Sequence, residues 1–218
     1  MSLRVDAAEA RARMVELQLR RRGISDERVL RAMGCVPREL FVPEELREDA
    51  YEDRALPIGH GQTISQPYIV ATICALLGLE GHERVLDVGT GSGYQAAVLA
   101  ELAAEVVTIE RVPELAEAAR RALAEAGHGH VDVRVGDGSL GVPDRAPFAA
   151  IAVAAAAPSI PPALYSQLVD GGRLVVPRGS RSGQELVLVV RTPDGPQERA
   201  SVACRFVPLV GEEGFAGA

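Results

Sequence analysis

The sequence predicts an α/β domain with a mainly parallel, doubly wound sheet, an N-terminal helical cap and a C-terminal antiparallel hairpin. From residue 84 onward, short apolar runs alternate with segments of helical periodicity, and this alternation is typical of βαβ units. A glycine-rich turn joins the first apolar run to the first helix, as in sheets that bind ligands at their strand ends. The last two apolar runs flank residues 192–197 (TPDGPQ), whose Pro-Asp-Gly residues favour a hairpin turn.

The first part of the chain, residues 1–78, is expected to form the helical cap and a segment that contacts the substrate. Residues 6–22 have helical periodicity and stop before a glycine, which is a helix terminator. A second helix is expected over residues 25–34 and a third over residues 67–77. We expect residues 79–218 to form the ligand-binding α/β domain with the C-terminal strands, and both parts to make one structural unit.

The α/β part is expected to alternate strands with helices until the hairpin. Its first strand, RVLDVG, is short and apolar and ends on a glycine. A proline at position 113 suits the first turn of the helix after the second strand. The expected strands are 84–89, 105–110, 131–135, 148–153, 172–177, 184–191 and 200–209, and the helices between them are 94–103, 112–127 and 160–169.

The composition is that of a globular protein and excludes several classes of function. Apolar residues make up 47% of the chain, and the net charge of −7 argues against nucleic-acid binding, which needs clustered positive charge. The chain has no apolar run long enough to span a membrane. Its three distant cysteines lack metal-ligand spacing and suit a reducing compartment. We therefore expect a cytoplasmic monomer without a metal and without nucleic-acid or membrane partners.

The glycine loop after the first strand carries the main functional signal. It runs DVGTGSGY from Asp87, with glycines at positions 89, 91 and 93. Glycine allows a sharp turn and a close approach of the ligand that a Cβ atom would block. Glu110 ends the next strand, where a carboxylate can accept hydrogen bonds from the ribose hydroxyls of a nucleotide-like ligand.

Two cofactor classes compete for this loop. Residues 91–96 (GSGYQA) fit the G-x-G-x-x-A pattern of dinucleotide-binding proteins, but that interpretation leaves Asp87 and Gly89 without a role. An acid at this position suits S-adenosylmethionine, which has an ammonium group and no pyrophosphate. Asp137, in the GDG stretch after the third strand, can meet an adenine amino group. S-adenosylmethionine is the favoured ligand, while a nicotinamide or flavin nucleotide and a ligand-free strand–turn–helix remain open.

The stretch HGQTISQPY, residues 60–68, is the second functional candidate. It contains no aspartate, glutamate, lysine or arginine, and it offers hydroxyls at Thr63 and Ser65. Its position before an apolar helix favours Ser65 as the helix N-cap, with proline in the first turn. His60 is a weaker candidate for a loop acid or base. The His128-Gly-His130 pair lacks a carboxylate or cysteine partner in sequence, so we expect no metal there.

Taken together, these stretches resemble the protein-L-isoaspartate (D-aspartate) O-methyltransferase family over residues 10 to 211, roughly. The resemblance implies a Rossmann-like methyltransferase fold, S-adenosyl-L-methionine as cofactor and S-adenosyl-L-homocysteine as product. It implies methyl transfer to the free α-carboxylate of L-isoaspartyl and D-aspartyl residues in damaged proteins and peptides, which starts repair through a succinimide. The matching stretches are VPRELFVPEELREDAYEDRALPIGHGQTISQPYIVA, RVLDVGTGSGYQAAVLA, VTIERVPELAEAAR, VRVGDG, APSIPPAL, LVDGGRLVVPRG, QELVLV and RFVPL.

The resemblance also assigns roles to single residues. Ser65 matches the active-site serine, and Thr63 and Ile64 match residues that bind substrate beside it. The chain departs from the usual family pattern at Ser139, Leu140 and Ala154, which puts its substrate preference in question. The residues that the resemblance assigns to the cofactor are Asp87, Gly89, Thr90, Gly91, Gly93, Glu110, Arg111, Asp137 and Gly138, with residues 206–209 nearby.

The implied chemistry agrees with the lack of charge around Ser65. A carboxylate nucleophile is already ionised at neutral pH, because its reference pKa is near 4, so it needs no general base. A cation held on it would stabilise the ground state more than the transition state, whereas a neutral hydroxyl orients it and leaves it nucleophilic. Three alternatives remain: a methyltransferase for aspartate in a dedicated peptide, a non-catalytic S-adenosylmethionine-binding module, and a nucleotide-dependent oxidoreductase.

Overall fold

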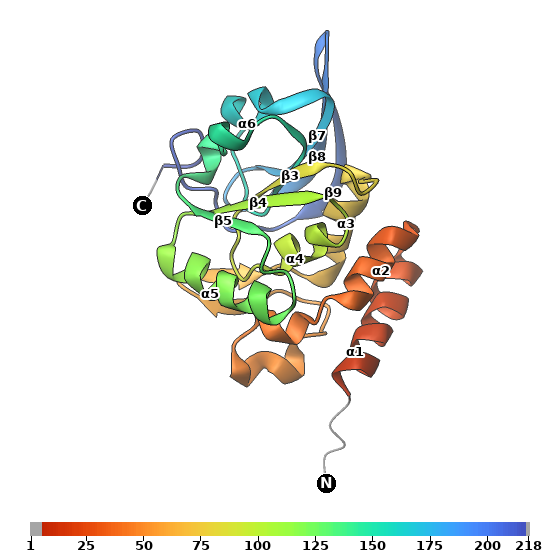
Figure 1. Cartoon of the computed structure of the whole chain (residues 1–218). Helices are drawn as coiled ribbons and strands as arrows, with labels where there is room; N and C mark the ends of the chain where they lie inside the picture. The colour runs from red at the N-terminus through yellow and green to blue at the C-terminus, as the bar shows by residue number, and fades with distance from the viewer. Residues whose placement is uncertain (1–5, 217–218) are drawn as a thin grey trace.

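A computed structural model describes residues 6–216 and shows a twisted sheet with helices packed on both faces (Figure 1). Within that range, seven strands form one sheet in the order β5-β4-β3-β6-β7-β8-β9. The pairs from β5 to β7 are parallel, and β8 and β9 add an antiparallel hairpin at one edge, so the predicted fold class is confirmed. The strands are β3 (Arg84–Val88), β4 (Glu105–Glu110), β5 (Asp132–Val135), β6 (Phe148–Val153), β7 (Leu168–Gly179), β8 (Gln184–Thr192) and β9 (Gly195–Cys204).

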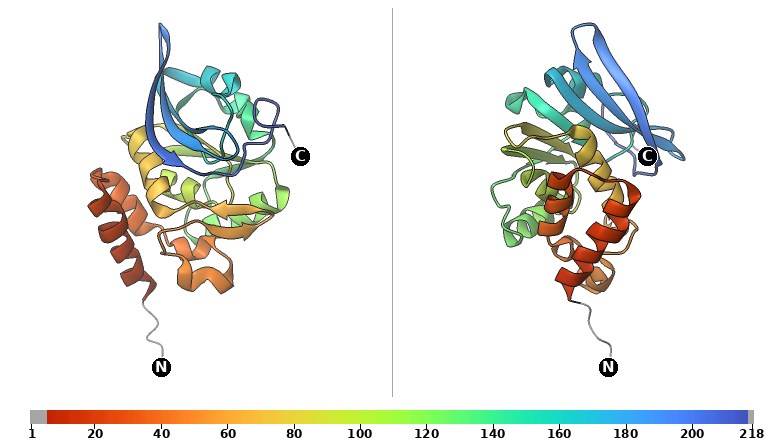
Figure 2. Two further views of the ribbon diagram at one scale, coloured as in Figure 1. Left: turned by 180° about the vertical axis from the view of Figure 1, so that it is seen from behind. Right: turned by 90° about the vertical axis from the view of Figure 1, so that its right-hand side faces the viewer.

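The helices begin and end where the local sequence indicates. Asp26 caps α2 by accepting hydrogen bonds from the backbone amides of Arg28 and Val29, and Gly23 ends the first helical segment with a φ of 97°. Two views show α1 and α2 side by side, far from the tip of the β8–β9 hairpin (Figure 2). The α-helices are α1 (Ala7–Arg13), α2 (Glu27–Cys35), α3 (Pro67–Leu77), α4 (Tyr94–Ala100), α5 (Pro113–Glu125) and α6 (Pro162–Ser166). A π-helix spans Met14–Leu19, and 3-10 helices span Arg20–Arg22, Arg38–Phe41, Glu44–Asp49, Gly138–Leu140 and Pro143–Arg145.

Three elements differ from the sequence prediction. The last strand, β9, spans Gly195–Cys204 and not residues 200–209, because Thr192 already pairs with Gly195 and leaves a turn of only two residues. Residues 56–64 form a small antiparallel hairpin of β1 (Leu56–Gly59) and β2 (Gln62–Ile64), where an irregular segment was expected. Its turn is tight because His60 and Gly61 both have positive φ. The helix expected over residues 160–169 is only five residues long. The chain then enters β7 early, because Leu168 pairs with Phe148 of the neighbouring strand.

The sheet separates two hydrophobic clusters, one on each face. Alternate residues of β3 face opposite ways, so Val85 joins the first cluster and Leu86 the second. Met14 and Met33, from the N-terminal segment, belong to the same cluster as Val85. The helical cap and this face of the sheet therefore bury one continuous core, which fixes the cap relative to the strand ends.

No helix among residues 6–216 has the length and apolar character needed to cross a membrane. The longest α-helix, α5, has 13 residues and carries five glutamates or arginines on its exposed face. A membrane-spanning helix needs about 20 predominantly apolar residues.

Candidate active site

A cleft opens at the carboxyl ends of β3, β4 and β6. It lies between the glycine loop, the β1–β2 hairpin and a C-terminal segment, residues 207–210. Its empty volume is about 900 Å³ when space open to solvent is included. Ligands of open parallel sheets bind at this edge. The lining residues are 62–65, Val70, 88–92, Tyr94, Gln95, 109–112, Gly138, Ala154, Ala155 and 207–210.

The three glycines of the loop after β3 have different tasks. All three have positive φ, between 51° and 91°, a conformation that side-chain-bearing residues rarely adopt. Gly89 and Gly91 line the cleft. Gly93 does not: a Cβ atom there would lie 3.3 Å from Ala119 and from Leu123 of α5. Gly93 therefore lets α4 pack closely against α5, and its expected contact with a cofactor stays a prediction.

Glu110, at the end of β4, shapes the loop and faces the cleft. One carboxylate oxygen accepts a hydrogen bond from the Gly91 amide at 2.9 Å, and the other accepts from the Val112 amide at 3.0 Å. The side chain is 6% exposed. Each oxygen retains a lone pair for a further donor, so Glu110 can accept hydrogen bonds from a ligand while it holds the loop. Arg111, beside it, lines the same cleft.

Asp87 lies beneath the loop and not in the wall of the cleft. Its carboxylate is fully buried and accepts hydrogen bonds from Gln95 Nε2 at 2.7 Å and Thr108 Oγ1 at 2.8 Å. Burial raises its pKa to about 6, against the opposing effect of these two hydrogen bonds. Thr90, which lines the cleft, is 2.7 Å from Thr108. Asp87 is thus linked to the cleft through Gln95, Thr108 and Thr90, and its expected role toward a cofactor stays a prediction.

Gln95 is a cleft residue that the sequence analysis did not single out. Its amide nitrogen binds Asp87, and its amide oxygen is buried and has no hydrogen-bond partner among the described residues. Buried polar atoms are almost always paired. An unpaired acceptor at this position can therefore take a hydrogen bond from a donor of a ligand or a water molecule. Gln95 is the second residue of the helix after the loop, and only its contact with Asp87 indicates a role at the site.

Asp137, expected at the adenine, is turned toward the C-terminal segment. Its carboxylate accepts hydrogen bonds from the backbone amides of Ser139 at 2.9 Å and Glu212 at 2.8 Å, and from the Ser139 hydroxyl at 2.7 Å. Burial acts to raise its pKa, but these hydrogen bonds outweigh that effect and hold the pKa below its usual range. In this structure Gly138, and not Asp137, lines the cleft. Ser139 also accepts from the Glu213 amide, so this departure from the family pattern fastens the C-terminal segment.

The segment around Ser65 forms the other side of the cleft. Thr63 and Ile64 belong to β2, and Ser65 follows it. The N-cap of α3 is Gln66, without a side-chain cap hydrogen bond, so the interpretation of Ser65 as the helix cap is wrong. Ser65 is half-buried. It lines both the cofactor-side cleft and a second groove, which runs from Gln66 and Ile69 to residues 203–207.

The segment after β9 closes the cleft from the opposite side. The Ala156 amide donates to the Val207 carbonyl at 2.8 Å, and the Leu209 amide donates to the Ala156 carbonyl at 2.7 Å. These bonds hold residues 207–209 beside the end of β6, where they contribute apolar surface to the cleft. Ala154, the other departure from the family pattern, lines the cleft and the second groove.

The remaining candidates lie away from the cleft. His60 is exposed at the tip of the β1–β2 hairpin. His128 is buried at 7% exposure and lies 3.6 Å from Glu101. Burial lowers its pKa, although Glu101 opposes the shift. No group of three or more histidine, cysteine, aspartate or glutamate side chains suited to a metal ion occurs within residues 6–216.

Comparison with known sequences gives the family. The family described as protein-L-isoaspartate(D-aspartate) O-methyltransferase matches residues 9–214. The chain belongs to this family. It is 58% identical over 212 residues to protein-L-isoaspartate O-methyltransferase 2 of Marinobacter nauticus, covering 96% of this chain and 97% of that one. It is 55% identical over 207 residues to the protein-L-isoaspartate O-methyltransferase of Methanoculleus marisnigri, covering 95% and 94%.

Solved structures of the protein-L-isoaspartate O-methyltransferase family have the same fold. One of them superposes with a TM-score of 0.82 at 29% identity, covering 93% of this chain and 66% of that chain. A Plasmodium falciparum protein described as a protein-L-isoaspartate O-methyltransferase superposes with a TM-score of 0.80 at 25% identity, covering 92% and 98%. The second structure is a complex with S-adenosyl-L-homocysteine.

Proposed function

We infer that this protein transfers the methyl group of S-adenosyl-L-methionine to the free α-carboxylate of L-isoaspartyl and D-aspartyl residues in proteins and peptides. The methyl ester then cyclises to a succinimide, which opens in part to normal aspartate. Family membership over residues 9–214 supports this assignment. The observation that carries it is the uncharged, hydroxyl-bearing segment at Ser65, which lies between the nucleotide-type cleft and a second groove.

The residues of the cleft suit S-adenosylmethionine. The unpaired oxygen of Gln95, beside the buried carboxylate of Asp87, offers an acceptor and a negative charge to an ammonium group. Glu110 retains lone pairs for ribose hydroxyls. We propose that Gly89, Thr90, Gly91, Arg111 and Gly138 contact the cofactor directly, while Asp87, Gly93 and Asp137 support the residues that do.

The cofactor supplies an activated methyl group on a sulfonium, and the chain supplies position. We propose that the Ser65 hydroxyl donates a hydrogen bond to the substrate carboxylate and orients it, with Thr63 and Ile64 beside it. No general base is required, because the carboxylate is already ionised. Aligning two reacting groups in a partly closed site is worth several orders of magnitude in rate. A neutral hydrogen-bond donor orients the carboxylate without reducing the attraction between the anionic carboxylate and the cationic sulfonium.

The second groove gives the peptide a place to lie. It meets the cofactor cleft at Thr63, Ser65, Ala154 and Val207, which line both. A carboxylate presented from the groove therefore reaches the cleft beside Ser65. This junction of two openings favours a macromolecular substrate over a small metabolite. It also favours an enzyme over a module that only binds the cofactor.

The assignment is tested by transfer of labelled methyl from S-adenosylmethionine to two peptides that differ only in an isoaspartyl or an aspartyl residue. We expect label in the isoaspartyl peptide alone, released by mild base as expected for a methyl ester. Label in the aspartyl peptide alone would favour an enzyme for a dedicated peptide. Label in neither, with S-adenosylhomocysteine still bound, would favour a non-catalytic binding module.

We further propose that the protein acts as a cytoplasmic monomer on isoaspartyl-containing proteins and without nucleic-acid or membrane partners. The net charge of −7 supports this for nucleic acid. Three free cysteines, with Cys74 buried, suit a reducing compartment. The continuous core of the cap and sheet supports residues 1–78 and 79–218 as one unit. Light scattering at working concentration tests the monomer, which a mass of twice 23.0 kDa would contradict.

A further inference from the structure

Arg38 is a fully buried arginine directly behind the Ser65 segment. It begins the short turn Arg38–Phe41 in the helical cap, and its exposure is 0%. Its Nε donates to the carbonyl of Ala50 at 2.7 Å, and its Nη2 donates to the carbonyl of Ser65 at 2.8 Å. Arginine is almost never fully buried without a partner of opposite charge, so the complete burial of Arg38 requires an explanation.

The surroundings of Arg38 leave its charge without a counterion. Among the described residues, no carboxylate lies within ion-pair distance of it, and its Nη1 is buried without a partner. The guanidinium carbon lies 4.7 Å from the centre of the Tyr94 ring, a cation–π contact. Burial lowers its pKa to about 10. Such burial is costly, and a neutral apolar side chain of similar size would avoid the cost.

The three contacts of Arg38 join three parts of the molecule. Ala50 belongs to the cap, Ser65 to the substrate segment, and Tyr94 is the first residue of α4, directly after the glycine loop. Tyr94 also packs edge-to-face on Phe41, with ring centres 5.7 Å apart. A planar guanidinium can reach two carbonyls and a ring face at once, which a lysine ammonium cannot do with the same fixed geometry.

We propose that Arg38 is a positioning residue, which fixes the backbone at Ser65 relative to the glycine loop and so aims the Ser65 hydroxyl at the reacting carboxylate. This assignment rests on the proposed function. The Ser65 carbonyl points back to Arg38, while Ser65 also lines the cleft. Loss of the two guanidinium hydrogen bonds, to the Ala50 and Ser65 carbonyls, would leave the glycine loop in place but no longer fix the position of the Ser65 hydroxyl. A misplacement of about 1 Å can cost about a hundredfold in rate.

The test compares Arg38→Met and Arg38→Lys with wild type and with Arg173→Met. Arg173 is a matched control, because its guanidinium also binds two backbone carbonyls, those of Leu77 and Gly78, but far from the cleft-lining residues. We would measure kcat and KM for an isoaspartyl peptide, the Kd of S-adenosylhomocysteine by calorimetry, and the midpoint of thermal unfolding. Lysine serves as the second variant if methionine at this site prevents folding.

We expect kcat to fall about ten- to a hundredfold in both Arg38 variants, with the Kd of S-adenosylhomocysteine within about twofold of wild type. Arg173→Met should lower the unfolding midpoint and leave kcat unchanged. Unchanged kcat in a folded Arg38 variant would overturn the proposal. So would a Kd that rises in parallel with the loss of kcat, or a loss of folding in both variants, because either result assigns Arg38 to the fold alone. If the wild-type protein transfers no methyl group to the isoaspartyl peptide, that result overturns the proposed function, and this assignment with it.

Discussion

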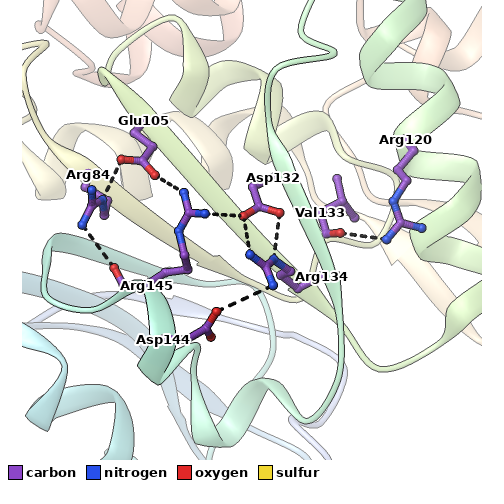
Figure 3. Close-up of polar contacts among 8 residues, drawn as sticks. All are labelled: Arg84, Glu105, Arg120, Asp132, Val133, Arg134, Asp144 and Arg145. Carbon is purple, nitrogen blue, oxygen red and sulfur yellow. Dashed lines mark hydrogen bonds and ion pairs between the residues drawn. The ribbon is translucent and has the colours of Figure 1, made fainter.

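The two ends of the same parallel strands use charged residues in opposite ways. At the amino ends of β3, β4 and β5, Arg84, Glu105 and Asp132 belong to a surface network of ion pairs (Figure 3). At the carboxyl ends of β3 and β4, Asp87 and Glu110 are almost fully buried and bind loops. The comparison separates charges that stabilise the fold from charges that shape a site.

The amino-end network is continuous but exposed. Arg84 binds Glu105 at 2.6 Å, and Arg145 bridges Glu105 to Asp132, which it approaches to 3.2 Å. Arg134 extends the chain of contacts from Asp132 at 2.8 Å to Asp144 at 3.7 Å. The side chains of this network are between 28% and 66% exposed. Water and salt screen such pairs, so each one contributes little to stability.

The carboxyl-end charges act on geometry. Glu110 is 6% exposed and takes both its protein hydrogen bonds from backbone amides of the loops on either side of it. Asp87 holds Gln95 and Thr108 in place under the same loop. Because few waters compete there, the loss of one partner leaves others unpaired. We therefore expect a glutamate at the carboxyl end of β4, Glu110, to matter more for ligand binding than a glutamate at its amino end, Glu105.

The largest expected effect is that of Glu110→Ala. It removes the acceptor for the Gly91 and Val112 amides and the proposed partner of the ribose. Each unpaired buried donor costs about 1–3 kcal/mol, so we expect the Kd of S-adenosylhomocysteine to rise at least about a hundredfold in calorimetry. Glu105→Ala, on the same strand, is the matched control and should bind like wild type. Equal losses in both variants would break the comparison.

A smaller effect is expected from pH through Asp87. Its pKa in the ligand-free protein is raised to about 6 by burial, and an ammonium nearby favours the ionised form. The affinity for S-adenosylhomocysteine should therefore fall about fivefold between pH 6 and pH 5, because about half of the Asp87 carboxyl groups are already protonated at pH 6. Asp87→Asn should bind more weakly at pH 7.5 and show a flatter profile. A wild-type affinity that does not change over this range would contradict a role of the Asp87 charge.

The same shift has a consequence for the ligand-free fold. Because the folded pKa of Asp87 lies above its value of 3.8 in the unfolded chain, the folded state binds the proton more tightly. The contribution of Asp87 to the free energy of unfolding is fully present below pH 3.8 and is lost as the pH rises through about 6. Urea unfolding at pH 5 and pH 7 tests this. The free energy of unfolding of the wild type should fall relative to that of Asp87→Asn between pH 5 and pH 7, because the asparagine stays neutral at both pH values.

The smallest effect is that of Glu105→Ala on stability. It removes the contacts to Arg84 and Arg145, which are one-third or more exposed, so we expect a loss of about 1 kcal/mol or less. For a domain of this size the unfolding midpoint should fall by about 2–4 °C, and by less in 1 M salt. Turnover should not change. A larger fall that persists in high salt would show that the network acts as more than a screened surface feature.

Features of the fold and of the site that depend on neighbouring residues in the chain could be predicted from the sequence. The strands of the α/β part, the glycine loop and Glu110 follow from periodicity and from glycines at strand ends, and the structure places Glu110 and the loop together. The order of the strands in the sheet comes from the structure. The β1–β2 hairpin was missed because its strands are only three and four residues long. The hydrogen bond from the Glu212 amide to Asp137, 75 residues away, could not be predicted, because nothing local in the sequence indicates it.

The supporting residues could not be predicted, because their contacts are tertiary. Gln95 and Arg38 have unremarkable positions in sequence, and each gains its meaning from a buried partner that is distant in the chain or on another element. Ser65 is the converse case. Local position favoured a helix cap, yet the cap is Gln66 and Ser65 faces two openings.

The central claim is that an uncharged hydroxyl at the carboxyl end of the sheet orients a carboxylate for methyl transfer. The most direct test is the single-turnover rate of Ser65→Ala with S-adenosylmethionine and an isoaspartyl peptide both saturating. The account predicts a rate about a hundredfold below wild type, with the Kd of S-adenosylhomocysteine unchanged. A wild-type rate for Ser65→Ala would contradict it.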